Sequence, residues 1–141
     1  MTRRVNYFLC LPFLLLLLLV MFNAGCGGTS AQQPDCSTAV ALGIVPSSGS
    51  ADHAAASPGN KVSFFASDVL PQGCIPRPGP IRHDLHWTVS DTTNTTIGNT
   101  PNVDDGLATC ANATPAPVTV TATGPNERGT TISGTATLTC R

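Results

Sequence analysis

The sequence predicts an all-β protein, built as an antiparallel β-sandwich of about seven short strands. Three observations favour this fold class. After residue 35 the chain is rich in Thr, Val, Ala, Gly and Pro, and no stretch keeps a helical period for more than a turn or two. Several segments alternate apolar and polar residues with a period of two, as half-buried strands do. Turn residues separate these segments.

The first three predicted strands cover residues 39–45, 61–67 and 85–90. The first ends at Pro46, which cannot donate a backbone hydrogen bond within a sheet. In the second and third, alternate side chains point to opposite faces, and one face is apolar. The predicted inward-facing side chains are Val62, Phe64, Ala66, Leu85, Trp87 and Val89.

The last two long strands are predicted at residues 118–123 and 131–140, with shorter edge strands at 95–97 and 107–109. Threonine and serine occupy nearly every second position of the long pair and would face solvent. The predicted inward-facing residues are Val118, Val120, Ala122, Ile132, Gly134, Ala136, Leu138 and Cys140. A polar outer face and an apolar inner face on each strand predict two sheets packed together.

Residues 1–25 are predicted to be a secretory signal peptide. Arg3 and Arg4 precede an apolar run at 8–22, and small residues follow it. This order of basic, apolar and small residues is typical of export signals. The alternative is a retained transmembrane helix, which needs about 20 apolar residues. The run is shorter than that and contains Pro12.

The segment Asn23-Ala24-Gly25-Cys26 resembles the lipobox of bacterial lipoproteins. The resemblance implies that Cys26 carries a diacylglyceryl thioether and becomes the new N-terminus, so that the membrane is a partner through the lipid. Gly27 stands where that family has Asp for inner-membrane retention, which implies the outer membrane rather than the inner one. The alternative is an ordinary signal peptide cut nearby, which leaves Cys26 as an odd thiol.

Cleavage after residue 25 would leave 116 of the 141 residues, with five Lys and Arg against eight Asp and Glu, a net charge of −3. A mildly acidic chain of this length suits one domain and gives no electrostatic reason to bind nucleic acid. Residues 26–36 are mostly small and polar, a composition that cannot bury enough surface to fold. They are predicted to be a tether, followed by the domain at 37–141.

A series of motifs occurs in order along residues 38–140. They are Gly59-Asn60-Lys61-Val62, Trp87-Thr88-Val89-Ser90-Asp91, Gly106-Leu107-Ala108-Thr109, 118–124 and Ser133-Gly134-Thr135-Ala136-Thr137-Leu138. This series resembles the bacterial immunoglobulin-like domains of group 2. The resemblance implies an immunoglobulin-like sandwich and a cell-surface adhesion role. The chain departs from the family in its proline-rich insert at 71–80 and in its cysteines.

Four cysteines follow Cys26 and allow three pairings. If successive strands alternate in direction, Cys36 and Cys74 lie at one pole of the sandwich, and Cys110 and Cys140 lie at the other. This placement favours the pairs Cys36–Cys74 and Cys110–Cys140. The wide spacing is atypical of a redox pair or a structural zinc site.

No catalytic, cofactor-binding or metal site is predicted. His83 and His86 are three residues apart, so on a strand they point to opposite faces and cannot share one metal. With Asp84 they are predicted to be a solvated strand edge. Asp104-Asp105-Gly106 lacks the spaced oxygen ligands of a calcium loop and is predicted to form a turn.

Phe65 is the centre of the predicted interaction surface, because the alternation that buries Phe64 turns it outward. Arg77 and Arg82 lie nearby in sequence and extend this surface. The favoured interpretation is structural, with Phe65 lying under the loop at 71–80, and an exposed adhesive spot is the alternative.

The function expected from the sequence is a lipid-anchored, monomeric module of the cell envelope, with a non-catalytic spacer, adhesion or interaction role. Its expected partners are the membrane and an envelope protein or polysaccharide, and no cofactor is expected. The alternative is a small periplasmic enzyme accessory or inhibitor domain.

Overall fold

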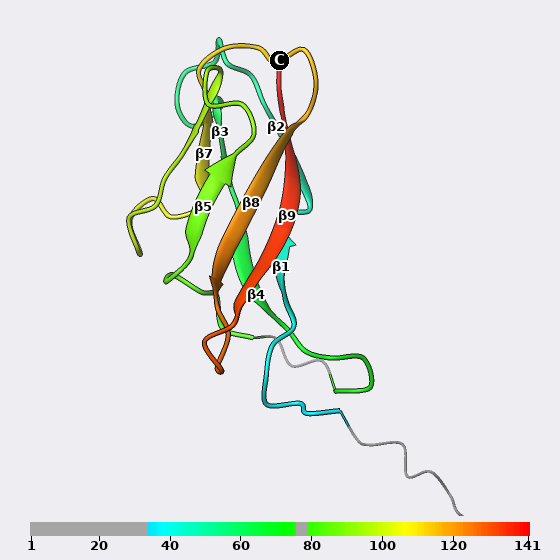
Figure 1. The fold of residues 1–141 in the computed structure, drawn as a ribbon. Coiled ribbons are helices and arrows are strands. Elements are labelled where there is room, and N and C mark those ends of the chain that lie inside the picture. The colour runs from blue at the N-terminus through cyan, green and yellow to red at the C-terminus, as the bar shows by residue number, and fades with distance from the viewer. Residues whose placement is uncertain (1–33, 76–78) are drawn as a thin grey trace, which may run out of the picture. The chain divides into compact units, whose positions relative to one another are not determined.

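The computed structural model describes residues 34–75 and 79–141, which form an all-β domain (Figure 1). Their strands are β1 (Ala41–Val45), β2 (Ser48–Ala51), β3 (Lys61–Ser63), β4 (Phe65–Val69), β5 (His86–Val89), β6 (Thr95–Ile97), β7 (Leu107–Cys110), β8 (Val118–Pro125) and β9 (Thr131–Cys140). The predicted signal peptide, Cys26 and Arg77 lie outside the described residues.

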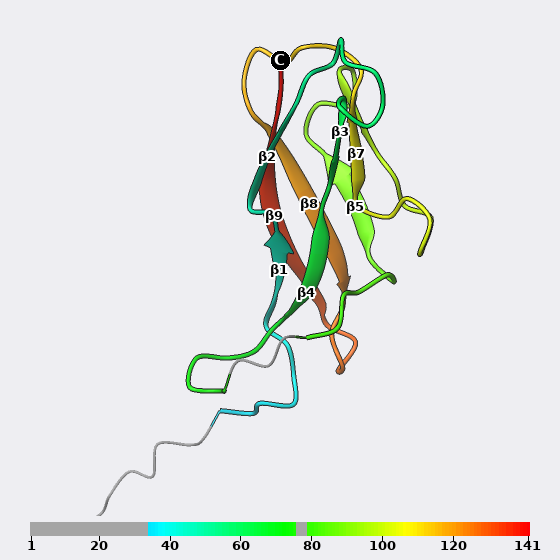
Figure 2. The same cartoon turned by 180° about the vertical axis from the view of Figure 1, so that it is seen from behind.

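The strands form three sheets. One has four strands in the order β2-β9-β8-β5, one has three in the order β3-β7-β6, and β1 pairs with β4. The two opposite views place β5, β8 and β9 on one side of the domain and β3, β4 and β7 on the other (Figures 1 and 2). An all-β domain of several sheets is consistent with the predicted sandwich.

The core lies between these sheets, around Trp87 and Phe64. Both rings are buried, together with the alternate residues of the long strands β8 and β9. The buried apolar residues of these two strands are Val118, Val120, Ala122, Ile132, Ala136, Leu138 and Cys140. The inward face predicted for β8 and β9 is therefore confirmed, and their Thr and Ser residues lie on the outer face.

The predicted strand count and the prediction of wholly antiparallel pairing both need correction. The described residues contain nine strands, because the predicted strand 61–67 is divided at Phe64 and an unpredicted strand, β2, follows β1. After Pro46 and Ser47 the chain leaves the β1–β4 pair and continues along β9. There β2 pairs in parallel with β9, from Ser48 beside Thr137 to Ala51 beside Cys140.

Gly134 explains how closely β1 approaches β9. A Cβ atom at this position would overlap the backbone carbonyl group of Leu42. Only glycine leaves room for the two backbones to come this close. The inward position predicted for Gly134 is therefore occupied by the neighbouring strand rather than by a side chain.

Asn99 caps the edge of the four-stranded sheet at β5. Its Oδ1 accepts a hydrogen bond from the Trp87 backbone N at 2.6 Å, and its Nδ2 donates to the Trp87 carbonyl O at 3.0 Å. The side-chain amide thus takes the place of a neighbouring strand. Capping of this kind blocks pairing with another chain at that point.

The disulfides join Cys36 to Cys74 and Cys110 to Cys140, with a Cα–Cα distance of 5.6 Å in each. These are the two pairs favoured by the alternation of strand direction. We call the end of the domain at residues 34–40, 70–75, 79–81 and 125–131 the tether-side pole. The end at residues 52–60, 90–94 and 111–117 is the far pole.

Candidate functional site

The surface predicted around Phe65 is exposed. Phe65 is 46% exposed, so the described part of the loop after β4 does not cover it. It pairs across the strands with Val45, which is also exposed. Because directly opposite side chains in an antiparallel pair lie close together, Phe65 and Val45 form one small apolar patch on the outer face of the β1–β4 pair. We call these two residues the outer pair.

Arg82, which the sequence placed beside this surface, is engaged in ion pairs within the chain. Its Nε and Nη2 contact the two carboxylate oxygens of Asp84 at 2.9 and 2.5 Å, and its Nη1 contacts Asp68 Oδ1 at 3.0 Å. The Arg82 side chain is only 13% exposed. A bidentate pair of this kind is among the stronger ionic contacts in proteins. Arg82 therefore ties the segment before β5 to β4.

These contacts alter proton binding by both partners. The hydrogen bond from Arg82 is the largest cause that lowers the pKa of Asp84, and the hydrogen bond to Asp84 raises the pKa of Arg82. Sequence inspection missed this cluster because Asp68 is 14 residues from Arg82. Only the path of the loop after β4 brings the two together.

Replacing Arg82 with methionine should lower the free energy of unfolding at neutral pH by about 1–2 kcal/mol. The substitution keeps the aliphatic stem and removes the charge that holds Asp68 and Asp84. Because the pKa of Asp84 is lowered in the folded state, its contribution is present above the ordinary aspartate pKa of about 3.9 and is lost as pH falls through the folded value. Urea unfolding at pH 7 and pH 3 should therefore show a smaller difference between wild type and R82M at pH 3.

Arg128 provides the matched control. It forms an ion pair with Asp35, but both side chains are well exposed. Exposed pairs contribute little, so Arg128→Met should change the free energy of unfolding by less than about 0.5 kcal/mol. Equal losses for R82M and R128M would contradict a structural role for the Arg82 cluster.

His83 contacts a residue that the sequence did not suggest. Its Nδ1 lies 2.8 Å from Asp105 Oδ2, and the Asp105 side chain is mostly buried. The neighbouring Asp104 accepts a hydrogen bond from the backbone N of Thr100 at 2.8 Å. The predicted turn at Asp104-Asp105-Gly106 is thus held by the Asp104 carboxylate, while the Asp105 carboxylate contacts the ring of His83.

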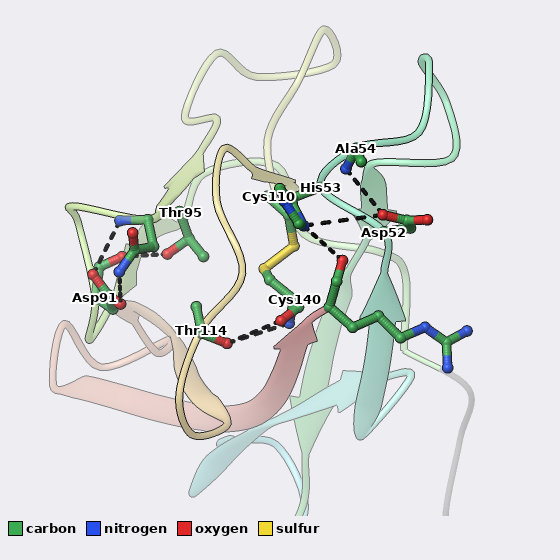
Figure 3. The surroundings of a disulfide bond; sticks show 10 residues. Asp52, His53, Ala54, Asp91, Thr95, Cys110, Thr114 and Cys140 are labelled. Atoms are coloured by element: carbon green, nitrogen blue, oxygen red, sulfur yellow. Dashed lines mark hydrogen bonds and ion pairs between the residues drawn. A yellow bond between two sulfur atoms is a disulfide. The ribbon is translucent and has the colours of Figure 1, made fainter.

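The far pole surrounds the buried disulfide between Cys110 and Cys140 (Figure 3). The backbone N of Thr114 donates to the Cys140 carbonyl O at 3.0 Å, which holds the loop after β7 beside the bond. Asp91 accepts hydrogen bonds from the backbone N of Thr93 and of Asn94. Bonds from Asn94 lower the pKa of Asp91. These contacts organise loops and leave the carboxylate of Asp91 engaged within the turn.

A shallow groove of about 430 Å³ lies at the tether-side pole. Its walls are Asp35, Thr38, Ala39, Val40, Pro71, Asn126, Arg128, Thr130, Thr131 and Ile132. Several polar groups of its walls bind within the chain, since Asp35 pairs with Arg128 and Asn126 Nδ2 donates to the Ala39 carbonyl O at 3.0 Å. The walls also include the aliphatic side chains of Ala39, Val40 and Pro71.

Within residues 34–75 and 79–141, no three His, Cys, Asp or Glu side chains are grouped closely enough to hold a metal ion. The same residues include no helix of the length and apolar character needed to cross a membrane. No family model, curated protein or solved structure matches the chain.

Proposed function

We propose that the protein is an exported lipoprotein, held in the cell envelope through acyl chains on Cys26. The leader and the segment Asn23-Ala24-Gly25-Cys26 support this, although both lie outside the described residues. The two disulfides of the domain also support it, because such bonds persist in oxidising compartments outside the cytoplasm. The outer membrane is the proposed location, on the resemblance of Cys26-Gly27 to the sorting position of lipoproteins.

The domain is proposed to be immunoglobulin-like, of the bacterial group 2 kind. Joining β1 with β2 and β3 with β4 as single interrupted strands gives seven strands in chain order. Two sheets result, the four-stranded sheet β2-β9-β8-β5 and a combined sheet in which β1-β4 continues into β3-β7-β6. This is the strand order of an immunoglobulin sandwich in which the first strand contributes to both sheets. This topology supports the proposal.

Two of the motifs also have structural roles that fit the resemblance. Asp91, in the polar corner after Trp87, receives the backbone N–H groups of the following turn. Gly106 has a φ of 74°, and a Cβ atom there would overlap the Phe64 carbonyl O. A left-handed backbone so close to the core strand requires glycine. The backbone conformation and the close contact at this position therefore explain the glycine of the motif Gly106-Leu107-Ala108-Thr109.

In this role the domain is a non-catalytic spacer, adhesion or interaction module. The observation that carries the proposal is the outer pair, Phe65 and Val45, which stays exposed while the charges described around Arg82 are engaged within the chain. An exposed aromatic ring beside an aliphatic side chain is suited to bind a partner in the envelope, either a protein or a polysaccharide.

The lipid anchor is tested by replacing Cys26 with alanine. Cells given labelled palmitate should incorporate label into the wild-type chain and not into C26A, and C26A should move from the membrane to the soluble fraction. Cys36→Ala is an unsuitable control because it leaves a free thiol at Cys74, so Ser30→Ala within the tether is used instead. Label retained by C26A would contradict the anchor.

The interaction surface is tested by Phe65→Ser, with Val103→Ser as the matched control. Val103 is also an exposed apolar residue, but it lies in the loop between β6 and β7, away from the outer pair. We expect F65S to lose partners that wild type and V103S capture from envelope extracts, or to lose binding to purified envelope polysaccharide. Equal binding by all three chains would rule out this surface.

A further inference from the structure

Exposed apolar side chains are distributed unequally between the two poles of the domain. Val40, Val69, Ile75 and Ile81 are all exposed, and they lie before β1, at the end of β4 and in the loop that follows it. The loops of the far pole, at 52–60, 90–94 and 111–117, contain no Val, Leu, Ile, Met, Phe, Tyr or Trp. A polar pole opposite an apolar one indicates that the two ends meet different surroundings.

The most exposed of these residues is held where the tether joins the domain. Ile75 is 82% exposed and directly follows Cys74, which is bonded to Cys36. The Cα atoms of Cys36 and Cys74 are 5.6 Å apart, and the next Cα along a chain is about 3.8 Å away. The disulfide therefore keeps Ile75 within about 10 Å of the point where the tether enters the domain.

The length of the tether limits how far this pole can be from a lipid anchor. Cys36 follows Cys26 by ten positions, and a fully extended chain of that length reaches about 35 Å. The far pole is further away by the length of β9, about 33 Å for ten residues. Of the two poles, only the apolar one is kept near the bilayer by covalent bonds.

From these observations we propose that the tether-side pole rests on the lipid surface, with Ile75 inserted among the headgroups and Val40 and Val69 beside it. This inference rests on the lipid anchor at Cys26 proposed above. The anchor raises the effective concentration of lipid at the pole, so a contact too weak to bind a free domain is sufficient once the chain is tethered.

The charged side chains described at this pole are engaged within the protein. We therefore expect its contact with lipid to be made by apolar side chains rather than by attraction to anionic headgroups. Arg128 within this pole and Arg82, which directly follows its residues 79–81, are both in ion pairs with aspartates. Glu127 accepts a hydrogen bond from the Ala39 backbone N at 2.9 Å. The contact should therefore form on zwitterionic lipid and persist in high salt.

The test uses the full lipid-modified chain on phosphatidylcholine vesicles that contain brominated phosphatidylcholine, which quenches tryptophan at short range. Ile75→Trp places a reporter at the tether-side pole, and Ala113→Trp, in an exposed loop of the far pole, is the matched control. The native Trp87 is buried and adds the same background to both. We expect a roughly twofold loss of the added emission in I75W, at a depth of about 5–10 Å, and none in A113W, in low or high salt.

Each other outcome overturns the inference. Unquenched I75W on vesicle-bound protein overturns the pole contact and leaves the lipid anchor intact. Protein that does not sediment with vesicles overturns both. Equal quenching of I75W and A113W excludes a preferred pole, and quenching abolished by salt excludes an apolar contact. A blue shift of I75W that rises with protein concentration before vesicles are added would show that a second copy of the chain covers the patch.

Discussion

Replacing Cys110 and Cys140 together with alanine should lower the free energy of unfolding by roughly 4–5 kcal/mol. The bond spans 30 residues, for which the chain-entropy model gives about 3.6 kcal/mol. Both cysteines are also only 1% exposed, so losing the sulfur atoms leaves unfilled space in the core. Small domains are often only about 5–15 kcal/mol stable, and urea unfolding of the double variant should show the loss directly.

The second disulfide separates the effect of loop closure from the effect of burial. Cys36–Cys74 spans 38 residues, so chain entropy alone predicts a slightly larger contribution from it, about 3.9 kcal/mol. Because Cys36 is exposed near the start of the domain, its removal creates little empty space. We therefore expect the Cys36→Ala/Cys74→Ala variant to lose less stability than the Cys110→Ala/Cys140→Ala variant. The reverse order would show that burial of the far-pole bond contributes nothing.

Reduction under native conditions gives an independent check. Thiol–disulfide exchange requires access to a sulfur atom. Dithiothreitol should therefore open Cys36–Cys74 first, while Cys110–Cys140 resists until the domain unfolds. Mass mapping of alkylated peptides at successive times would show the order, and simultaneous opening of both bonds would contradict it.

The sequence predicted best those elements whose own residues specify their conformation. In β8 and β9, Thr or Ser alternates with apolar residues or glycine over residues 118–123 and 131–140, and this pattern alone indicates which face is buried. Trp87 could be assigned to the core for the same reason. By contrast, β2 is Ser48-Gly49-Ser50-Ala51, which has no β-branched or aromatic residue to mark a strand. It forms a strand because it pairs with β9. The residues of β2 do not themselves indicate this pairing, because β9 is distant along the chain.

The same distinction applies to the candidate surfaces. Phe65 could be placed outside because alternation with Phe64 is a local property. Arg82 was placed beside Phe65 from its position in the sequence, which does not reveal that the loop after β4 returns it to Asp68. His83 and Asp105 are 22 residues apart and meet only in the folded chain. Ion pairs between loops depend on tertiary structure, so composition and spacing could not predict them.

Replacing Trp87 with alanine should cost about 3–5 kcal/mol, comparable to the loss of the far-pole disulfide. The ring is 2% exposed and lies at the centre of the core, where Leu138, Val120 and Phe64 are also buried. Alanine would leave a cavity that strands joined by hydrogen bonds and a disulfide cannot close. The backbone bonds between Trp87 and Asn99 do not involve the ring, so the edge cap should survive and the loss should reflect packing.

Phenylalanine at position 87 should cost much less, about 1–2 kcal/mol. It fills most of the space, and it removes the indole Nε1–H, which is buried without a hydrogen-bond acceptor among the described residues. Burying such a group costs free energy, so its removal offsets part of the lost volume. Phe65→Ser is the control for an exposed ring and should change stability by less than about 1 kcal/mol. Because Trp87 is the only tryptophan in the sequence, circular dichroism must follow the unfolding. Equal losses for W87A and W87F would contradict a stabilising role for the volume of the ring.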